Sequence, residues 1–434
     1  FLTENNGREA MHAYLVSFSV RLLGRTPAAV RLPSAIASIL TTLGIFLVAR
    51  SLFGNRIGML SSMFYAFTVW PIMLGRLATR PALLPLFLTF SLWLGITAFI
   101  HAGKWRWLLS GLTFGAAFYT YTPIRVILLA PILCSVFFLT FVNYRRHCKG
   151  ALLFWAALAA TAAPFVSYTI VHKEEVFGRS AGVAVVSLED SPKEIISTLY
   201  AQTTTVLPMY LVPGKGDWNL RHNIPNRPAL DPIVSTALLV GLLLSLTGNY
   251  RRKTIPIFIW IGIGLLPTIL SEEPPHFARA SSTLTVLFIF PALGLCWAYA
   301  KLRRRLPYFL AIAISSGALL YSVFLTTRDL FLDNYLATPT AGFWFDEQCT
   351  IASREINRFL HIGWHGDPGI PQNRSPYPSR QVLIATNICP RYSSSGYYTV
   401  QFLVPIELGE DTRFQRYDLQ TLPKLSSLSQ ELLI

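Results

Sequence analysis

The 434-residue sequence has little charge. Only 14% of its residues are Asp, Glu, Lys or Arg, whereas a soluble domain carries about 25%. This scarcity excludes an ordinary soluble globule, and a hydrophobic content of 52% makes lipid the expected solvent. Acidic residues are the scarcest, with 22 against 37 Lys and Arg and a formal net charge of +15. The basic residues punctuate apolar runs and do not form one polar face, so no nucleic-acid partner is expected.

Recognisable soluble-enzyme motifs are also lacking. No phosphate-binding loop, dinucleotide-binding or protease motif occurs, and the five cysteines show no spacing typical of zinc. Cys349 and Cys389, in the polar C-terminal part, either pair or remain free thiols. Because Phe1 is not a natural first residue and no signal peptide precedes the first apolar stretch, we expect the sequence to lack its beginning.

Long apolar runs dominate the chain. Each must form a helix of about 20 residues to cross a hydrocarbon core of about 30 Å, because backbone groups cannot stay unpaired in lipid. Ten transmembrane helices are predicted near 34–49, 57–74, 82–100, 107–119, 124–142, 151–171, 232–247, 254–270, 280–300 and 307–325.

Basic loops give the orientation. Five basic segments fall on one side if every run crosses once, which makes that side cytoplasmic by the positive-inside rule. These segments lie at Arg50/Arg56, Lys104/Arg106, Arg145/Arg146/Lys149, Arg251/Arg252/Lys253 and Lys301/Arg303/Arg304/Arg305. The opposite face receives 75–81, 119–125, the loop 172–231, 271–280 and everything after 326.

The ends of the chain differ from the apolar middle. Residues 1–33 are predicted as an external loop in which 8–24 form an amphipathic interfacial helix. Residues 34–325 form the transmembrane domain. Residues 326–434 read as a small extracytoplasmic α/β domain, with a helix at 344–362 and strands at 381–386 and 397–404.

The candidate site consists of cations and carboxylates on the outer face. Two arginines four residues apart at a helix end, Arg76 and Arg80, can present guanidinium groups to one anion, and a guanidinium matches phosphate oxygens in pairs. The predicted ligand is a phosphate or diphosphate at the membrane interface. The candidates are Glu4, Arg8, Glu9, Arg76, Arg80, Arg125, Arg221, His222, Glu272, Glu273, His276 and Arg279.

Ordinary structural roles compete with each functional assignment. A single arginine at a helix end can contact lipid headgroups, and a lone histidine is usually structural. The glutamates Glu4, Glu9, Glu272 and Glu273 neutralise the cations by default. One of them could also serve as a general base or bind a metal.

Several segments in order resemble bacterial members of the dolichyl-phosphate-mannose protein mannosyltransferase superfamily, the GT-C glycosyltransferases that include the aminoarabinose lipid A transferases. The segments are Glu4-Asn5-Asn6-Gly7-Arg8-Glu9 followed by Tyr14-Leu15, Arg31 to Ala35, Ala49 to Gly54, Arg76 to Arg80, Tyr119 to Arg125, and more weakly Pro274-Pro275-His276 with Arg279.

The resemblance implies a GT-C fold and transfer of a sugar from a polyprenyl-phosphate donor to a hydroxyl of a protein, lipid or glycan, with inversion. It implies a multi-pass protein of the cell inner (plasma) membrane with its active site on the extracytoplasmic side. Membrane lipid is the surrounding partner. No cofactor is certain, and a divalent metal is one option.

The resemblance also distributes roles. The lipid phosphate would bind Arg8, Arg76, Arg80, Arg125, His276 and Arg279. The family's catalytic Asp would precede Phe1, which leaves Glu4 and Glu9 as the catalytic candidates within this sequence. Arg80 stands where several members carry an acidic residue.

Two other classes stay open. A transporter or flippase for an anionic lipid or solute would also need cations, although no repeat between two halves is evident. A noncatalytic membrane protein with a partner-binding outer domain is the third hypothesis.

Overall fold

The computed structural model describes residues 9–434 except 102, 142–146, 175, 178–183, 187–189, 333–334, 336–337, 339–340, 367–380, 386–397, 405–413, 418–430 and 434. The chain divides into two compact units. The first comprises Phe1–Ala13 and Ser34–Tyr335, and the second comprises Tyr14–Pro33 and Leu336–Ile434.

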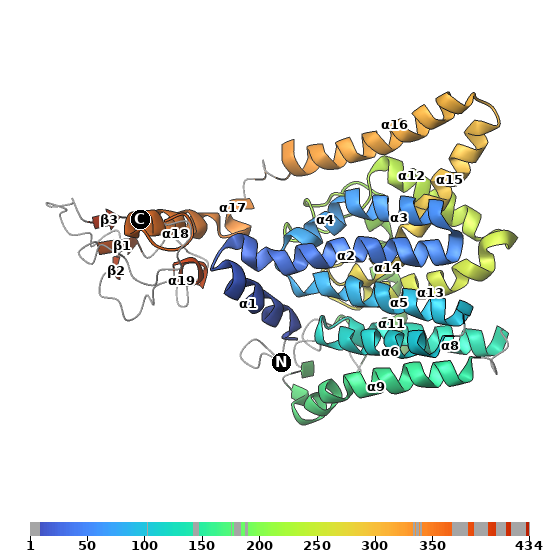
Figure 1. The fold of residues 1–434 in the computed structure, drawn as a ribbon, viewed down its shortest axis with the longest axis horizontal. Coiled ribbons are helices and arrows are strands. Elements are labelled where there is room, and N and C mark those ends of the chain that lie inside the picture. The colour runs from blue at the N-terminus through green and yellow to red at the C-terminus, as the bar shows by residue number, and fades with distance from the viewer. Residues whose placement is uncertain are drawn as a thin grey trace. The chain divides into compact units, whose positions relative to one another are not determined.

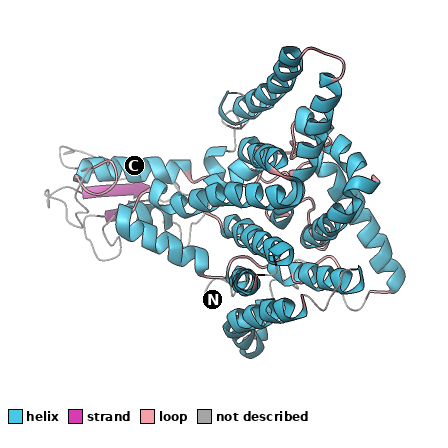
Figure 2. Cartoon of the chain, turned by 45° about the vertical axis from the view of Figure 1, so that its right-hand side comes forward, coloured by secondary structure: helices cyan, strands magenta, loops and turns pink. Residues whose placement is uncertain are grey.

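The first unit is a bundle of helices (Figures 1 and 2). Its α-helices, of which α2 begins in the second unit, are α2 Pro27–Phe53, α3 Asn55–Phe67, α4 Val69–Arg76, α5 Leu83–His101, α6 Lys104–Ala116, α7 Ile124–Ile127, α8 Leu129–Phe141, α9 Cys148–Val171, α11 Pro192–Val206, α12 Pro232–Ser245, α13 Gly248–Ile269, α14 Leu284–Leu287, α15 Ile289–Arg303 and α16 Tyr308–Thr327. Short turns of other helix types are η2 Arg80–Ala82, η3 Ala117–Tyr119, η5 Leu207–Tyr210, η6 Ser281–Thr283 and the π-helical η7 Arg328–Leu332.

Each of the ten predicted apolar runs is helical. Six described helices are long and apolar enough to cross a membrane, and a seventh span results if the bent pair α3–α4 is one crossing. The runs at 107–119, 124–142 and 232–247 give shorter helices. The protein is therefore a multi-pass membrane protein, and ten crossings stay a prediction.

A break between α3 and α4 changes the direction of the chain near the end of the bundle that carries Arg76 and Arg80. The two helices meet at an angle of 62° at Thr68. Helix α4 then ends at Arg76, and Leu77 and Thr79 are extended before η2 starts at Arg80. The chain thus leaves its helical path between Arg76 and Arg80.

Glycines let pairs of helices approach closely. A Cβ on Gly241 of α12 would lie 1.8 Å from the carbonyl oxygen of Phe290 in α15, and one on Gly294 of α15 would lie 2.0 Å from that of Ala237. A Cβ on Gly111 of α6 would likewise lie 2.2 Å from the carbonyl oxygen of Phe154 in α9. Such small-residue contacts are a typical means of helix association in lipid, where apolar burial drives little.

The N-terminal helix α1, Met11–Leu23, lies within the predicted 8–24. Its large apolar side chains Tyr14, Phe18 and Leu22 recur at intervals of four residues and are exposed in the structure. This stripe is typical of a helix that lies in a membrane interface, and that location stays a prediction.

The second unit contains α17 Ala341–Trp344, α18 Glu347–Leu360 and α19 Tyr398–Leu403, with strands β1 Gln381–Ala385, β2 Phe414–Tyr417 and β3 Glu431–Leu433. The strands form a parallel sheet in the order β2-β1-β3. The predicted helix near 344–362 and the strand near 381–386 are present. Cys349 is disulfide-bonded, whereas Cys389 lies outside the described residues.

The strand predicted at 397–404 is wrong, because this segment forms helix α19. Val400, Leu403 and Val404 are buried and follow the three-and-four spacing of a helix. The amide of Asn357 in α18 also donates to the carbonyl of Leu403 at 3.1 Å. Packing against α18 therefore outweighs the strand preference of the Thr, Val and Phe side chains.

Candidate functional site

A buried carboxylate contacts two of the predicted phosphate-binding arginines. The side chain of Glu9 is 1% exposed, and three side chains far away in sequence contact its two oxygens. Arg80 Nη1 donates to Oε2 at 2.6 Å, Thr122 Oγ1 donates to Oε1 at 3.0 Å, and Arg125 Nη2 lies 3.9 Å from Oε1. We call Glu9, Arg80, Thr122 and Arg125 the Glu9 cluster.

The local backbone places Arg80 in this cluster. Because α4 ends at Arg76 and the next residues are extended, the side chain of Arg80 leaves the helix direction and reaches Glu9. Its guanidinium lies 5.8 Å from the ring of Tyr121, and its side chain is 20% exposed. Arg80 is therefore fixed by a carboxylate and an aromatic ring while part of it stays accessible.

Arg125 enters the cluster from the start of α7. Its Nη1 donates to the carbonyl of Val176 at 3.1 Å, and its guanidinium lies near the rings of Phe165 and Phe177 at 5.6 and 5.3 Å. Its Nε is buried and has no hydrogen-bond partner among the described residues. The Arg125 side chain as a whole is 18% exposed, so part of an oriented guanidinium stays accessible to an anion.

The cluster has a net positive charge. One carboxylate faces two guanidinium groups, which leaves a single positive charge if nothing else is ionised. His12 adds none, because burial, and secondarily the charge of Arg80, lowers its pKa to about 4. Its Nε2 lies 3.0 Å from Ser34 Oγ in a buried hydrogen bond. The geometry thus favours a neutralising and orienting role for Glu9 over that of a free base.

Arg76 makes contacts different from those of the Glu9 cluster. It is exposed, and its guanidinium lies 5.2 Å from the ring of Phe331. Arg76 and Arg80 were predicted to present their guanidinium groups to one anion at a helix end. Among the described residues they have different partners, Phe331 and Glu9, so the sharing of one anion stays a prediction.

Four more predicted site residues, Arg221, His222, His276 and Arg279, lie in two loops that contact each other. The rings of His222 and His276 contact each other in a tilted arrangement, with centroids 5.0 Å apart. Buried Asp217 joins the loops, since its carboxylate accepts from the backbone N–H of Phe277 at 2.7 Å and of Asn219 at 2.8 Å. Burial raises the pKa of Asp217 to about 6, and it lowers the pKa of His222 to about 4 and of His276 to about 3.

Arg279 belongs to the same loop region. Its positive charge helps to lower the pKa of both histidines. The carboxylates expected to balance it do not do so, because Glu272 and Glu273 are exposed and the contact to Arg279 Nη1 is the backbone carbonyl of Glu272, at 3.5 Å. Arg221 is half-buried beside His222.

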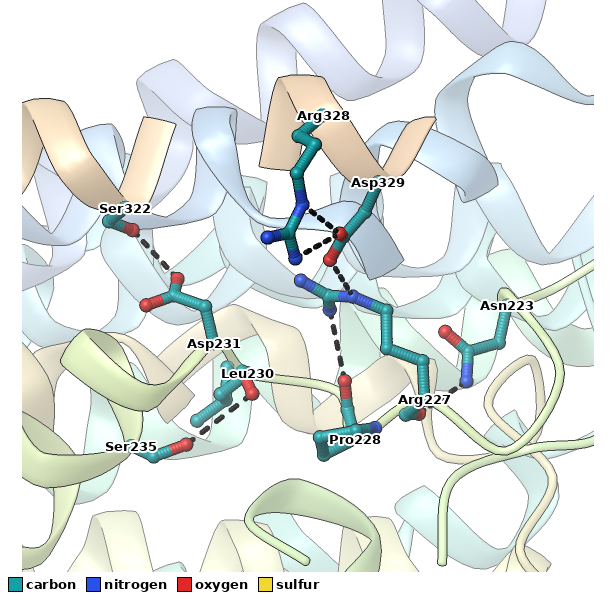
Figure 3. A network of polar contacts seen from close by, with 9 residues as sticks. All are labelled: Asn223, Arg227, Pro228, Leu230, Asp231, Ser235, Ser322, Arg328 and Asp329. Atoms are coloured by element: carbon teal, nitrogen blue, oxygen red, sulfur yellow. Dashed lines mark hydrogen bonds and ion pairs between the residues drawn. The ribbon is translucent and has the colours of Figure 1, made fainter. Parts of the chain in front are cut away.

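Two acidic residues tie the loop before α12 to the end of α16 (Figure 3). Asp329 in η7 accepts from Arg227 Nε at 2.7 Å and from Arg328 Nη2 at 2.9 Å. Asp231 caps α12 by accepting from the N–H groups of Ile233 and Val234, and its second oxygen accepts from Ser322 Oγ at 2.7 Å. These contacts hold the loop that carries Asp217 and His222.

Some candidates cannot be placed, and others were missed. Glu4 and Arg8 lie outside the described residues. Thr122 and Asp217 were not predicted, because nothing in their local sequence marks a buried partner of a distant group. Among the residues the structure describes, no group of three or more His, Cys, Asp or Glu could hold a metal ion.

Comparison with protein families supports the resemblance found in the sequence. Residues 9–172 match the family model described as dolichyl-phosphate-mannose-protein mannosyltransferase. This stretch contains the whole Glu9 cluster and ends before the histidine loops. The predicted resemblance to that superfamily is confirmed. No curated protein matches the chain.

Solved structures confirm the fold type. ArnT from Cupriavidus metallidurans, bound to undecaprenyl phosphate, has a TM-score of 0.52 at 10% identity over 92% of this chain and 74% of that one. The Archaeoglobus fulgidus oligosaccharyltransferase in the apo form has a TM-score of 0.53 at 13% identity, over 92% and 56%. The same enzyme tethered to an acceptor peptide gives 0.51 at 14%, over 92% and 55%. The chain thus spans little more than half of the archaeal protein, and the likeness is one of fold.

Proposed function

We propose that the protein is a membrane glycosyltransferase that moves a sugar from a polyprenyl-phosphate carrier to a hydroxyl acceptor. The observation that carries this proposal is the Glu9 cluster, a buried carboxylate that orients two arginines and leaves one positive charge. It lies inside the stretch that matches the mannosyltransferase family model. A fold relative bound to undecaprenyl phosphate supports the class of donor.

The charge of the cluster suits the leaving group of this reaction. A sugar linked to a lipid phosphate is a phosphodiester with one negative charge. When the acceptor oxygen attacks the anomeric carbon, the bond from that carbon to the phosphate oxygen breaks and its electron pair leaves with the phosphate. The released monoester carries about −1.5 to −2 at neutral pH. A fixed cationic site therefore binds the departing group more tightly than the donor, which lowers the barrier.

The remaining roles follow from this chemistry. Arg80 and Arg125 bind the phosphate, and Glu9 with Thr122 holds the two guanidinium groups in place. Arg279 and His276 supply a second polar contact to the phosphate from their loop. The acceptor proton passes to a carboxylate base, for which Glu4 stays a candidate, and attack from the side opposite the phosphate inverts the anomeric carbon.

The proposal places this site on the extracytoplasmic side. The five basic segments of the sequence assign the opposite ends of the helices to the cytoplasm. The disulfide of Cys349 supports the same orientation for the C-terminal part, because disulfides persist in oxidising compartments.

Sugar transfer in proteoliposomes tests the proposal. The full-length protein is supplied with radiolabelled sugar on polyprenyl phosphate and with membrane lipid and protein acceptors. We expect label in an acceptor, and a decrease of about 100-fold in Arg125→Gln, the size of effect seen when one donor to a developing oxyanion is removed. Arg56→Gln, an exposed arginine of a basic loop, is the matched control and should transfer normally.

Two outcomes would overturn the proposal. Movement of intact donor across the bilayer without transfer would identify a transporter or flippase. Neither transfer nor binding of polyprenyl phosphate, with any of the common carrier-linked sugars, would favour a noncatalytic membrane protein.

A further inference from the structure

A large cavity lies at the opposite, basic end of the bundle, among the ends of α2 and α5 and the starts of α6, α9 and α13. Its volume is about 820 Å³, within the range of about 300–1,000 Å³ typical of ligand pockets. Residues at the ends of these five helices, Ser51, Phe99, Trp107, His147 and Arg252, all line it. The cavity therefore lies at the depth of the lipid headgroups on the side that the sequence predicts to be cytoplasmic.

Its walls are mainly apolar and include several aromatic rings. Trp107, Phe114, Trp155 and Trp260 line the interior, and the ring of His147 stacks on Phe99 with centroids 4.2 Å apart. The side chains of Ser91 and Ser110 satisfy each other through hydrogen bonds to the backbone carbonyl of the other residue. Such a lining suits hydrocarbon and offers few unsatisfied polar groups to a water-soluble ligand.

Two cations complete the lining. Lys253 is held in place, since its Nζ donates to the carbonyl of Leu52 at 2.7 Å and lies 5.6 Å from the ring of Phe53. Arg252 is exposed and forms no ion pair with any side chain that the structure describes. Neither cation has an acidic neighbour in the sequence.

The sequence segments that form this end contain no acidic residue. No Asp or Glu occurs between Glu9 and Glu174, between Asp231 and Glu272, or between Glu273 and Asp329. Every residue that lines the cavity falls within these three intervals. The positive charge of Arg252 and Lys253 must therefore be balanced by something other than a neighbouring carboxylate of the same segments.

We propose that this cavity is a second lipid site, which holds an acyl chain of an anionic phospholipid while Arg252 and Lys253 bind its phosphate. The charge complementarity selects an anionic headgroup, and the aromatic interior selects hydrocarbon. A basic residue near an anionic lipid surface contributes about fivefold in affinity. The site is separate from the Glu9 cluster and does not depend on the glycosyltransferase proposal.

Photocrosslinking in nanodiscs tests this site. The full-length protein is placed in phosphatidylcholine nanodiscs that contain a trace of phosphatidylglycerol or phosphatidylcholine with a diazirine on one acyl chain. Labelled peptides are mapped by mass spectrometry, and labelling of α5, α6 and α9 is divided by labelling of α16. Helix α16 is a suitable reference for bulk lipid, because only 22% of its apolar window is buried.

Because two basic residues contribute about fivefold each, we expect this ratio to be about 25-fold higher for the phosphatidylglycerol probe than for the phosphatidylcholine probe. Arg252→Gln should lower the difference to about fivefold, the contribution of Lys253 alone, whereas Arg304→Gln, an exposed arginine of another basic segment, should retain the full difference. Ala151→Trp, which places a large side chain into the cavity, should lower the ratio for both probes.

Equal ratios for the two headgroups would overturn the proposal, because the cavity would then take up hydrocarbon without recognising the anion. An unchanged preference in Arg252→Gln would also overturn it. Since Arg252 is exposed, its substitution leaves the packing of the bundle intact and the result interpretable.

Discussion

Glu9 accepts a hydrogen bond from Arg80 at 2.6 Å, although the two residues are 71 positions apart in the sequence. The contact connects the segment before α1 to η2, and through Glu9 Oε1 it extends to Thr122 and Arg125. A single carboxylate thus determines the position of two guanidinium groups. We expect the stability and the anion binding of this region to depend on that pairing.

Breaking the pair from one side should be more harmful than removing it entirely. Arg80→Gln leaves a buried carboxylate with a weaker set of partners and should cost about 2–3 kcal/mol, below the 3–5 kcal/mol of a fully buried pair because Arg80 is partly exposed. Glu9→Gln with Arg80→Gln should recover part of this loss. Thermal unfolding in detergent for the four members of the double-mutant cycle measures the coupling. Additive effects would contradict a direct interaction.

The sequence predicts much of the bundle because lipid imposes helices on long apolar runs, and all ten runs are helical. It does not predict where a helix ends close to a site. Arg76 and Arg80 were paired as cations of one short loop, whereas α4 extends to Arg76, the chain is extended at Leu77 and Thr79, and only Arg80 reaches Glu9. The segment 397–404 was assigned to a strand because it is rich in β-branched and aromatic residues, and contacts with α18 decide the helical form of 398–403.

Residues of the site that act through long-range contacts were the hardest to predict. Glu9 was a candidate because it stands beside Arg8 in the predicted external loop, where a carboxylate neutralises cations by default and could serve as a general base. Thr122 and Asp217 lie in ordinary-looking loops, and their partners are 113 and 60 positions away. Only the folded arrangement shows that each completes a polar cluster.

The outer loops should become less stable in mild acid. In the unfolded chain His222 and His276 titrate near pH 6.5, whereas burial holds their folded pKa values at about 4 and about 3. The folded state therefore binds fewer protons below pH 6.5, and stability is lost as the pH falls toward 4. Thermal midpoints at about pH 7.5 and 5 measure this loss. The variant with His222→Gln and His276→Gln should lose less, and an equal loss would contradict the assignment.

Asp217 should act in the opposite direction. Its folded pKa is raised from 3.8 to about 6 by burial, so the folded state binds a proton as the pH falls below 6 while the unfolded state does not. This contribution is present below pH 3.8 and is lost as the pH rises through 6. Asp217→Asn removes it and should make the acid loss steeper in the same measurement. A shallower loss would show that the carboxyl stays ionised.

The contacts of Asp329 predict a contrast between two neighbouring residues. Asp329→Asn leaves Arg227, which is 11% exposed, without its carboxylate, and should destabilise by about 2–3 kcal/mol. Arg328→Gln removes a side chain that is 40% exposed and should cost less than about 1 kcal/mol. Thermal unfolding of both variants compares them. Equal effects would mean that Arg227 gains little from the ion pair.

The close approach of α12 and α15 predicts a contrast between two glycines. Gly241→Ala would place a Cβ 1.8 Å from the carbonyl of Phe290, so the helices must separate and the protein should be destabilised by more than about 2 kcal/mol. Gly317→Ala in α16 meets open space and should be neutral, or stabilising by up to about 1 kcal/mol through helix propensity. Thermal unfolding and yield after detergent extraction report both effects.

The most direct test of the central claim is the binding of a short-chain prenyl phosphate and of the corresponding prenyl alcohol to the purified protein, measured by titration calorimetry. If the Glu9 cluster binds the phosphate, the phosphate should bind more tightly than the alcohol, and Arg125→Gln should weaken only the phosphate, by about tenfold for the loss of about 1.4 kcal/mol from a charge-assisted contact. Equal affinity for phosphate and alcohol, or phosphate affinity that is unchanged in both Arg125→Gln and Arg80→Gln, would contradict the account.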